Sequence, residues 1–430
     1  MELQPFLLDK DFQQALDLME KTERPLFVTG KAGTGKSTLL QLFRNTTRKK
    51  AVVLAPTGVA ALNVKGQTIH SFFGFPPRLI DPRDIKKKKV RKLYQNLEVL
   101  IIDEISMVRA DILDSIDIFL RVNREDRRPF GGVQLVLFGD LFQLPPVVAS
   151  PTEQQYFQTY YQSPYFFSAK VFAQGFDMEI LELQHVYRQE QRHFLRLLDA
   201  IRLNRIDESD LEDLNERFMP DFEPADHYIT LSARNATVDS INQRELSKIR
   251  EPALYYTAFV GGEFNPQFFP TELRLELKIG AQVMFLKNDP ERRYVNGTIG
   301  KIVELKPDRI LTQILKPDGA LEEIEVERAE WEILRYKMNE SNPDKIETEV
   351  LGTFEQYPLR LAWAITIHKS QGKTFDKVII DLGRGAFEHG QTYVALSRCR
   401  TLEGIILRER LRPNDILTDE RVVEFFEQHR

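Results

Sequence analysis

Residues 30–38 carry the strongest chemical signal in the chain. Their sequence, GKAGTGKST, fits the phosphate-loop pattern, with Gly30, Gly35, Lys36 and Ser37 at the required positions. In such a loop the glycines let backbone N–H groups face phosphates, the lysine reaches the terminal phosphates and the serine hydroxyl binds Mg²⁺. The loop predicts that the chain consumes a nucleoside triphosphate, contacted by Gly33, Thr34, Gly35, Lys36, Ser37 and Thr38.

Two adjacent acids follow a second apolar run. VLIIDEIS (99–106) places Asp103 at the end of a predicted strand and Glu104 directly after it. We expect Asp103 to hold the hydration shell of Mg²⁺ and Glu104 to polarise the attacking water. Adjacent acids at a strand end are often plain surface residues, so it is their order after a phosphate loop that favours catalysis.

Three further polar residues could meet the γ-phosphate. Gln143 follows a predicted buried strand in FGDLFQLPP (138–146), while HVYRQ (185–189) and YVALSR (393–398) supply Arg188 and Arg398. Both arginines come after the first predicted sheet, so both could approach the nucleotide from a second domain. There they would stabilise transition-state charge and make closure depend on the γ-phosphate. Taken alone, each arginine is equally typical of a surface ion pair.

The segments that must position these residues alternate between short apolar strands and amphipathic helices. Predicted strands end just before the loop, at LFVTG (26–30), and recur at 51–56, 99–103 and 134–140. A second series occurs at 228–233, 377–383 and 404–408. Continuous apolar strands that alternate with helices indicate parallel sheets covered on both faces. The fold class is therefore α/β, with two domains of this kind.

The stretch between the first and second strands of the second series has a different character. From about 250 to 345 it holds strand-like runs, such as AQVMFL and GKIVEL, and the turn signals KPDR and KPDG. We therefore predict an antiparallel β unit at 249–345, inserted into a second domain made of 181–248 and 346–430. The first domain covers 1–180.

The composition narrows the class of protein. A formal net charge of -5 argues against a protein that coats nucleic acid through bulk charge, although a local basic groove is compatible with it. Cys399 is the single cysteine, which excludes an internal disulfide framework and fits a reducing compartment. The N-terminus shows no secretory signal, and no apolar run approaches the ~20 residues that cross a bilayer. We expect a cytoplasmic protein that does not engage membranes.

Two stretches are candidates for binding the phosphates of a polymer strand. PTGVAALNVKGQTIHSFFGFPP (56–77) and ITIHKSQG (365–372) combine hydroxyls, amides and histidines that hold phosphates without reading bases. The candidate contacts are Thr57, His70, Phe72, Thr366, His368, Lys369 and Gln371. Two alternatives stay open: the phenylalanines at 72, 73 and 75 could pack a small subdomain, and either histidine could be structural.

These segments together resemble the Pif-type helicases, which belong to the superfamily-one branch that also includes RecD-like proteins. The resemblance rests on motifs in family order over nearly the whole chain: GKAGTGKS, APTGVAALNVKGQTIHSFF, VLIIDEISM, GDLFQLPPV, VYRQ, ITIHKSQGKTF and YVALSR. It implies two RecA-like motor domains, a wedge element at about 65–95 in the first and a small β-barrel insertion in the second. It also implies an ATP-driven DNA helicase that moves five-prime to three-prime on single strands.

The resemblance assigns roles to further residues. Gln371 and Gly372 should lie nearer the nucleotide, while Thr366 and His368 face the strand. Gln13 or Gln14 should meet the adenine, with the register left open. The tip of the wedge is expected in FGFPPR (73–78), which includes Pro77, and further strand contacts at Lys287, Asn288, Asn296, Arg234 and Asn235.

The implied partners are single-stranded DNA and fork junctions, with quadruplexes and RNA–DNA hybrids as further candidates. The basic run KKKKVRK (86–92) is either a solvated face or a contact with duplex phosphates. We expect a monomer when free, in a bacterial or phage setting. Two rival interpretations stay open: a RecD-like subunit of a nuclease complex, and a nucleotide-gated DNA-binding switch that does not translocate.

Overall fold

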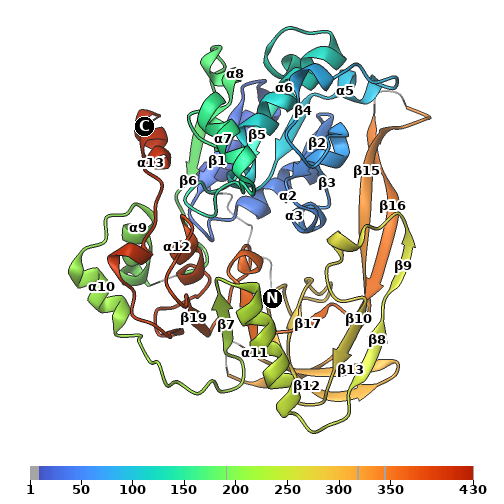
Figure 1. Ribbon diagram of the computed structural model, residues 1–430. Coiled ribbons are helices and arrows are strands. Elements are labelled where there is room, and N and C mark those ends of the chain that lie inside the picture. The colour runs from blue at the N-terminus through green and yellow to red at the C-terminus, as the bar shows by residue number, and fades with distance from the viewer. Residues whose placement is uncertain (1–8, 190, 317–318, 343–344, 430) are drawn as a thin grey trace.

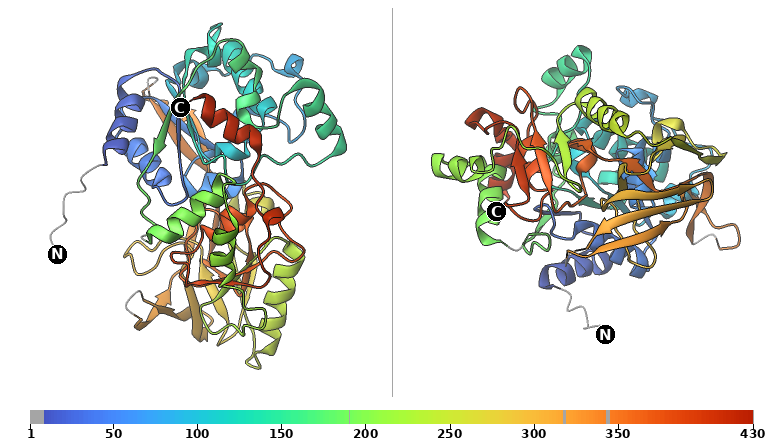
Figure 2. Two further views of the ribbon diagram at one scale, coloured as in Figure 1. Left: turned by 90° about the vertical axis from the view of Figure 1, so that its left-hand side faces the viewer. Right: turned by 90° about the horizontal axis from the view of Figure 1, so that it is seen from below.

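The computed structural model describes residues 9–189, 191–316, 319–342 and 345–429 (Figure 1). Within these ranges the chain forms two parallel sheets and a largely antiparallel insertion. The first domain lies above the other two parts in Figure 1, and Figure 2 shows the same division from the side. None of the helices described is both long and apolar enough to span a bilayer.

The first domain is built on a parallel sheet of apolar strands. Its order is β3-β2-β4-β5-β1-β6. The strand that precedes the phosphate loop, β1, and the strand that precedes the two acids, β4, therefore both lie inside the sheet. Strands β1, β4 and β5 are buried along their whole length, as continuous apolar runs require between two helical layers. The strands are β1 (Leu26–Gly30), β2 (Ala51–Ala55), β3 (Gln67–Thr68), β4 (Val99–Ile102), β5 (Gln134–Phe138) and β6 (Glu179–Leu183).

The helices of this domain alternate with its strands. They are α1 (Lys10–Lys21), α2 (Lys36–Thr46), α3 (Gly58–Asn63), α4 (Ile69–Phe73), α5 (Lys92–Asn96), α6 (Ala110–Arg124), α7 (Pro151–Tyr160) and α8 (Lys170–Ala173). Short loops at the carboxyl ends of β1, β4 and β5 therefore carry the phosphate loop, the two acids and Gln143 to one edge of the sheet.

The second domain has a smaller parallel sheet of order β18-β7-β19-β20. Its strands are β7 (Ile229–Ser232), β18 (Ala364–Thr366), β19 (Val378–Asp381) and β20 (Ile405–Leu407), and the helices from this part of the chain are α9 (Arg192–Arg202), α10 (Glu208–Asn215), α11 (Asn235–Lys248), α12 (Gln391–Leu396) and α13 (Glu420–Gln428). Helix α13 returns to the first domain, where Phe425 and Phe426 meet the rings of Phe166 and Phe27. The two α/β domains predicted from the sequence are confirmed.

The insertion forms three sheets, of orders β14-β13-β12-β11-β17, β15-β16-β9 and β10-β8. Its strands are β8 (Leu254–Thr257), β9 (Phe259–Gly262), β10 (Arg274–Leu277), β11 (Gln282–Phe285), β12 (Ile299–Lys306), β13 (Arg309–Leu315), β14 (Leu321–Val326), β15 (Ala329–Met338), β16 (Ile346–Gln356) and β17 (Leu359–Leu361). Strands β16 and β17 pair with β15 and β11, so the insertion's sheets extend past the predicted boundary at residue 345. None of the strand pairs among the described residues joins β14 to β17, and the small barrel stays a prediction.

The long hairpin of β15 and β16 reaches the first domain. Tyr336 on β15 accepts a hydrogen bond from the backbone N–H of Val53 (3.1 Å) and donates its own N–H to Oε1 of Gln67 (3.2 Å). A second contact lies at Gly58, where an added Cβ would come 2.2 Å from the ring of Phe268. The insertion therefore rests on the first domain beside α3, across the middle of the molecule.

The predicted wedge element contains α4 and α5 and is packed by aromatic rings. Phe72, Phe73 and Phe75 are all buried and contact the rings of Tyr94 and Phe119. These three phenylalanines thus build a small core, which is the packing alternative left open by the sequence. In the same loop, the side chain of Pro77 is exposed.

Because Phe72 is only 5% exposed, Phe72→Ala should lower the free energy of unfolding by about 3–5 kcal/mol, measured by urea denaturation. Val90→Ala, at a site 81% exposed in the same element, is the matched control and should change it by less than about 0.5 kcal/mol. If Phe72→Ala weakened DNA binding and left stability unchanged, Phe72 would be a strand contact and not a core residue.

Candidate nucleotide site between two motor domains

A cavity of about 510 Å³ lies between the two parallel-sheet domains. Both domains contribute side chains, so neither encloses the site alone. The lining residues are Phe12, Ala32, Gly33, Thr34, Gly35, Lys36, Ser37, Thr38, Glu104, Gln143, Tyr187, Arg188, Gly372, Thr374, Arg398 and Arg400. This set includes the predicted phosphate-loop residues from Gly33 to Thr38.

The phosphate loop has the backbone that its glycines permit. Gly33 and Gly35 have φ values of +87° and +83°, which residues with a Cβ rarely adopt. An added Cβ at Gly33 would lie 2.5 Å from Cβ of Arg188, so this glycine also lets the second domain approach. Helix α2 begins at Lys36, whose Nζ lies inside the loop and donates to the carbonyl oxygens of Gly30 and Lys31. The N-terminus of α2 and this ammonium together form an anion site.

The two acids lie directly after β4, with Glu104 in a left-handed conformation at φ 51°. Burial, together with the neighbouring charge of Glu104, raises the pKa of Asp103 to about 7. Burial also raises the pKa of Glu104, and Lys36 and Arg398 oppose this shift. A buried carboxylate with a raised pKa is suited to accept a proton from water.

Arg398 is buried and Arg188 is partly buried, and no carboxylate balances either positive charge at close range. Arg188 donates to the carbonyl oxygen of Ser397 (3.0 Å), and Arg398 is 1% exposed and bonds to Val394 and Ser397. Within the described ranges, neither guanidinium forms an ion pair. Burial and the nearby Arg398 lower the pKa of Arg188 to about 9. Cations desolvated in this way at a pocket wall indicate an anionic ligand, and a polyphosphate fits.

A hydrogen-bonded group at the same junction was not found from the sequence. Tyr393 accepts from the N–H of Ala32 in the phosphate loop (3.0 Å), and its hydroxyl lies 3.3 Å from Oδ2 of Asp140. Gln143 also donates to Asp140 (3.3 Å), and Arg202 lies 3.4 Å from its other oxygen. Asp140 lies in the motif GDLFQLPP and Tyr393 in YVALSR. A contact between residues so far apart in the sequence leaves no local pattern by which it could be predicted.

Gln13 and Gln14 lie outside the cavity. Both side chains are exposed, and Gln13 donates to Asp17 one helical turn away (2.9 Å). The rings of Phe12 and Tyr187 line this end of the cavity instead, 6.3 Å apart and edge to face. Aromatic rings suit a nucleobase because stacking requires no particular hydrogen-bond register.

The candidate strand contacts of the second domain surround β18. Thr366 is buried, and its hydroxyl accepts from the N–H of Lys369 (3.3 Å). Nε2 of His368 lies 3.1 Å from a carboxylate oxygen of Glu388. Lys369 is exposed. Among the described residues, the buried Nε2 of Gln371 has no hydrogen-bond partner.

The other candidates lie on several elements. Thr57 is exposed and caps α3, whereas His70 is half-buried on α4, where burial lowers its pKa. Arg234 and Asn235 are exposed at the start of α11, and the N–H of Asn296 donates to Asn288 (2.8 Å). Lys287 donates to the carbonyl oxygen of Glu330 within the insertion.

Comparison with known proteins identifies the family. A family model described as PIF1-like helicase matches residues 9–212, and one described as DNA helicase Pif1, 2B domain, matches residues 263–305. The ATP-dependent DNA helicase Pif1 of Bdellovibrio bacteriovorus is 34% identical, over 98% of this chain and 92% of its own length. The chain belongs to the Pif1-like helicases. It is an ATP-dependent DNA helicase.

Solved Pif1 structures share the fold of this chain, but the TM-score of the superposition differs from one structure to another. Bacteroides Pif1 in complex with ADP-AlF4 superposes with a TM-score of 0.91 at 38% identity, covering 99% of this chain and 97% of that one. Bacteroides Pif1 bound to single-stranded DNA covers 98% and 97% at 39% identity, but with a TM-score of 0.69. The human ATP-dependent DNA helicase PIF1 is longer, and the chain spans 60% of its length at 34% identity.

Because Arg188 reaches the site from beyond the first sheet, Arg188→Ala should lower the kcat of ATP hydrolysis about a thousandfold or more. Arg410→Ala, at an exposed position of the second domain, should retain the rate and serves as the matched control. Steady-state phosphate release measures both, with a melting curve to confirm folding. Hydrolysis at the normal rate in a folded Arg188→Ala variant would contradict a role at the γ-phosphate.

Proposed function

We propose that this Pif1-like helicase translocates five-prime to three-prime on single-stranded DNA and unwinds duplex and forked DNA. One observation carries the proposal: the nucleotide cavity is shared by both motor domains, with Lys36 and Glu104 from one and Arg188 and Arg398 from the other. Hydrolysis in a shared cavity changes how the two domains are held together, and alternating grip on a strand then gives movement.

Each polar residue of the cavity has a role in this scheme. Lys36 and the N-terminus of α2 bind the phosphates, and Gln143 orients the γ-phosphate. Glu104 accepts the proton of the attacking water, while the two arginines stabilise charge on the transferring phosphoryl group. A low dielectric in the closed cavity strengthens these interactions.

The residues present fit a magnesium ion. Ser37 lines the cavity and Asp103 lies beside Glu104, and Mg²⁺ is normally held by one or two such groups, water and substrate phosphates. The described ranges contain no cluster of three or more His, Cys, Asp or Glu able to hold a metal alone, which matches this mode. When bound, the ion neutralises phosphate charge.

Strand grip is assigned to both motor domains. In the first domain, the DNA backbone is contacted by Thr57 and His70. In the second domain, it is contacted by Thr366, His368 and Lys369. The exposed Pro77 contacts the fork. Bacteroides Pif1 has been crystallised bound to single-stranded DNA, and another solved structure is described as two coordinating Pif1 helicases unwinding forked double-stranded DNA. Quadruplexes and RNA–DNA hybrids are further proposed substrates. The free protein is proposed to be a monomer and to act in the cytoplasm.

Polarity is tested with duplexes that carry one single-stranded tail. The protein should displace the strand of a five-prime-tailed duplex and leave a three-prime-tailed one intact, monitored by fluorescence dequenching. Glu104→Gln should bind single-stranded DNA normally and lose hydrolysis by about 10²–10⁴-fold, so it should unwind neither. Equal displacement of both duplexes would overturn the assigned direction.

The same assay separates the rival interpretations. A nucleotide-gated switch would hydrolyse ATP slowly, without stimulation by single-stranded DNA, and would displace no strand. A RecD-like subunit would be inactive without its complex. A large stimulation of hydrolysis together with displacement by the isolated chain favours the motor over both.

A further inference from the structure

Two aromatic rings meet beside the phosphate loop at Gly35. An added Cβ at Gly35 would come 2.9 Å from Cζ of Phe12 and 3.6 Å from Cε2 of Tyr187. The two rings lie edge to face, with their centroids 6.3 Å apart. Phe12 comes from α1 and Tyr187 from the segment after β6, so two separate elements place a ring at the same point of the cavity.

Both rings are fixed in position. Phe12 is 3% exposed and belongs to the same core cluster as Ala15 and Met19 of its helix. The backbone N–H of Tyr187 donates to the carbonyl oxygen of Gly33 (2.9 Å), which ties this residue to the phosphate loop. The side chain of Tyr187 is 50% exposed, so part of its ring is free for a nucleobase to stack on.

Most of the charged or amide side chains that line the cavity belong to the phosphates in the proposed scheme. Lys36 and Arg398 both act electrostatically on Glu104. Gln143 donates to Asp140 (3.3 Å), which itself acts on Lys36 and Glu104. These groups therefore cluster with the phosphate-binding lysine and do not face the edge of a base.

The rest of the polar lining does not distinguish one base from another. Arg400 is held by Asp376, whose carboxylate oxygen lies 3.1 Å from its Nε. Among the described residues, the other polar side chains that line the cavity and are not assigned above carry hydroxyl groups: Thr34, Ser37, Thr38, Tyr187 and Thr374. A hydroxyl rotates to donate or to accept, so it suits an amino group and a keto group equally.

The amides and acids of α1 point away from this place. Gln13 donates to Asp17 (2.9 Å), Gln14 is exposed, and Asp11 accepts from the N–H of Gln184 (3.0 Å). None of them lines the cavity. Within the described ranges, no carboxamide or carboxylate therefore remains beside the rings to recognise a base by hydrogen bonds.

We propose that the site selects the triphosphate and not the base, so that GTP, CTP and UTP are hydrolysed as well as ATP. This inference deepens the proposed function and rests on its assignment of the cavity to the nucleotide. Every base has a π-face, so stacking against Phe12 and Tyr187 tolerates all four. A site that hydrogen-bonds the substrate would instead reject an analogue by about 10⁴ or more, because its own polar groups would be left unpaired.

The selectivity of the wild-type protein tests the proposal. Phosphate release is measured for each of the four triphosphates at a saturating concentration of a single-stranded oligonucleotide. The values of kcat/KM should lie within about 10² of one another, since an apolar pocket rejects a wrong group by no more than this. Any larger preference for ATP would show that the base is recognised by hydrogen bonds, and would overturn the proposal.

Variants of the two rings test the stacking. Tyr187→Ala should raise KM about tenfold for all four triphosphates, and Tyr187→Phe, which keeps the ring, should restore it. Phe12→Leu keeps an apolar side chain in the core and should raise KM several-fold, again for all four. A loss confined to ATP in a folded variant would contradict stacking that tolerates every base.

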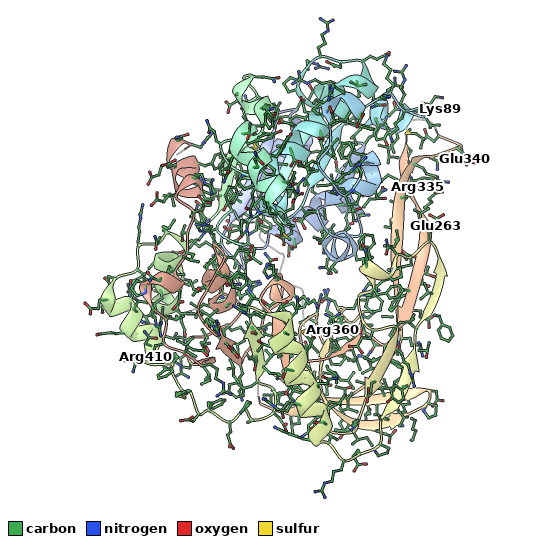
Figure 3. All side chains as sticks on the ribbon, in the orientation of Figure 1. Lys89, Glu263, Arg335, Glu340, Arg360 and Arg410 are labelled. Atoms are coloured by element: carbon green, nitrogen blue, oxygen red, sulfur yellow. The ribbon has the colours of Figure 1, made fainter. Side chains whose placement is uncertain are left out.

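Two control variants leave the rings intact. Gln13→Ala should leave all four KM values unchanged, because its side chain is outside the cavity. Arg410→Ala, at an exposed position on the outer edge of the second domain (Figure 3), should do the same. If Gln13→Ala weakened the use of ATP alone, Gln13 would be the residue that recognises adenine, and the proposal would fail.

Inorganic tripolyphosphate separates the base from the phosphates, because it has no base. Its inhibition constant against ATP should be the same for the wild-type protein and for Tyr187→Ala. An equal rise in both the inhibition constant and KM would mean that Tyr187 acts through the phosphate loop, which overturns the stacking role. Lys36→Ala should abolish hydrolysis of all four triphosphates; if hydrolysis persisted, it is the proposed function that would fail, since the nucleotide would not occupy this cavity.

Discussion

Desolvated positive charge at the junction of two sheets is the constraint on which the rest of this structure depends. Arg188 and Arg398 lie against the phosphate loop with backbone and hydroxyl partners, and within the described residues they form no ion pair. Removing such groups from water is costly, and a polyphosphate shared with Lys36 offsets that cost. Under the proposed function, the fit between the two domains depends on the state of the nucleotide, and hydrolysis moves one domain relative to the other.

The remaining architecture connects this junction to a strand. The hydrogen bond from the N–H of Ala32 to the hydroxyl of Tyr393 on α12 joins the second domain to the phosphate loop. The loop after β18 carries candidate strand contacts at one end and the cavity wall at Gly372 at the other. Meanwhile the hairpin of β15 and β16 rests on the first domain through Tyr336. This chain superposes on Bacteroides Pif1 in complex with ADP-AlF4 with a TM-score of 0.91, and on Bacteroides Pif1 bound to single-stranded DNA with a TM-score of 0.69.

Local patterns predicted the two sheets and the motif residues that line the cavity, because both follow from short-range signals. A glycine-rich loop between a strand and a helix, or an acid pair after an apolar run, needs no distant partner to be recognised. Errors and omissions arose where tertiary context decides. Gln13 points to solvent while Phe12 lines the cavity, a difference of one position on a helix. Likewise, the insertion's strands continue past residue 345, because β16 pairs with β15. The Tyr393–Ala32 contact joins segments that only folding brings together.

The most direct measurement of the central claim is the affinity for single-stranded DNA in two nucleotide states. In the wild-type protein, affinity with ADP should differ clearly from affinity with ADP and aluminium fluoride, because the latter engages both arginines. In Arg398→Lys, which keeps a charge but loses the planar fork, that difference should largely vanish. An equal difference in both proteins would show that the arginines do not connect the nucleotide to the strand, and would contradict the account.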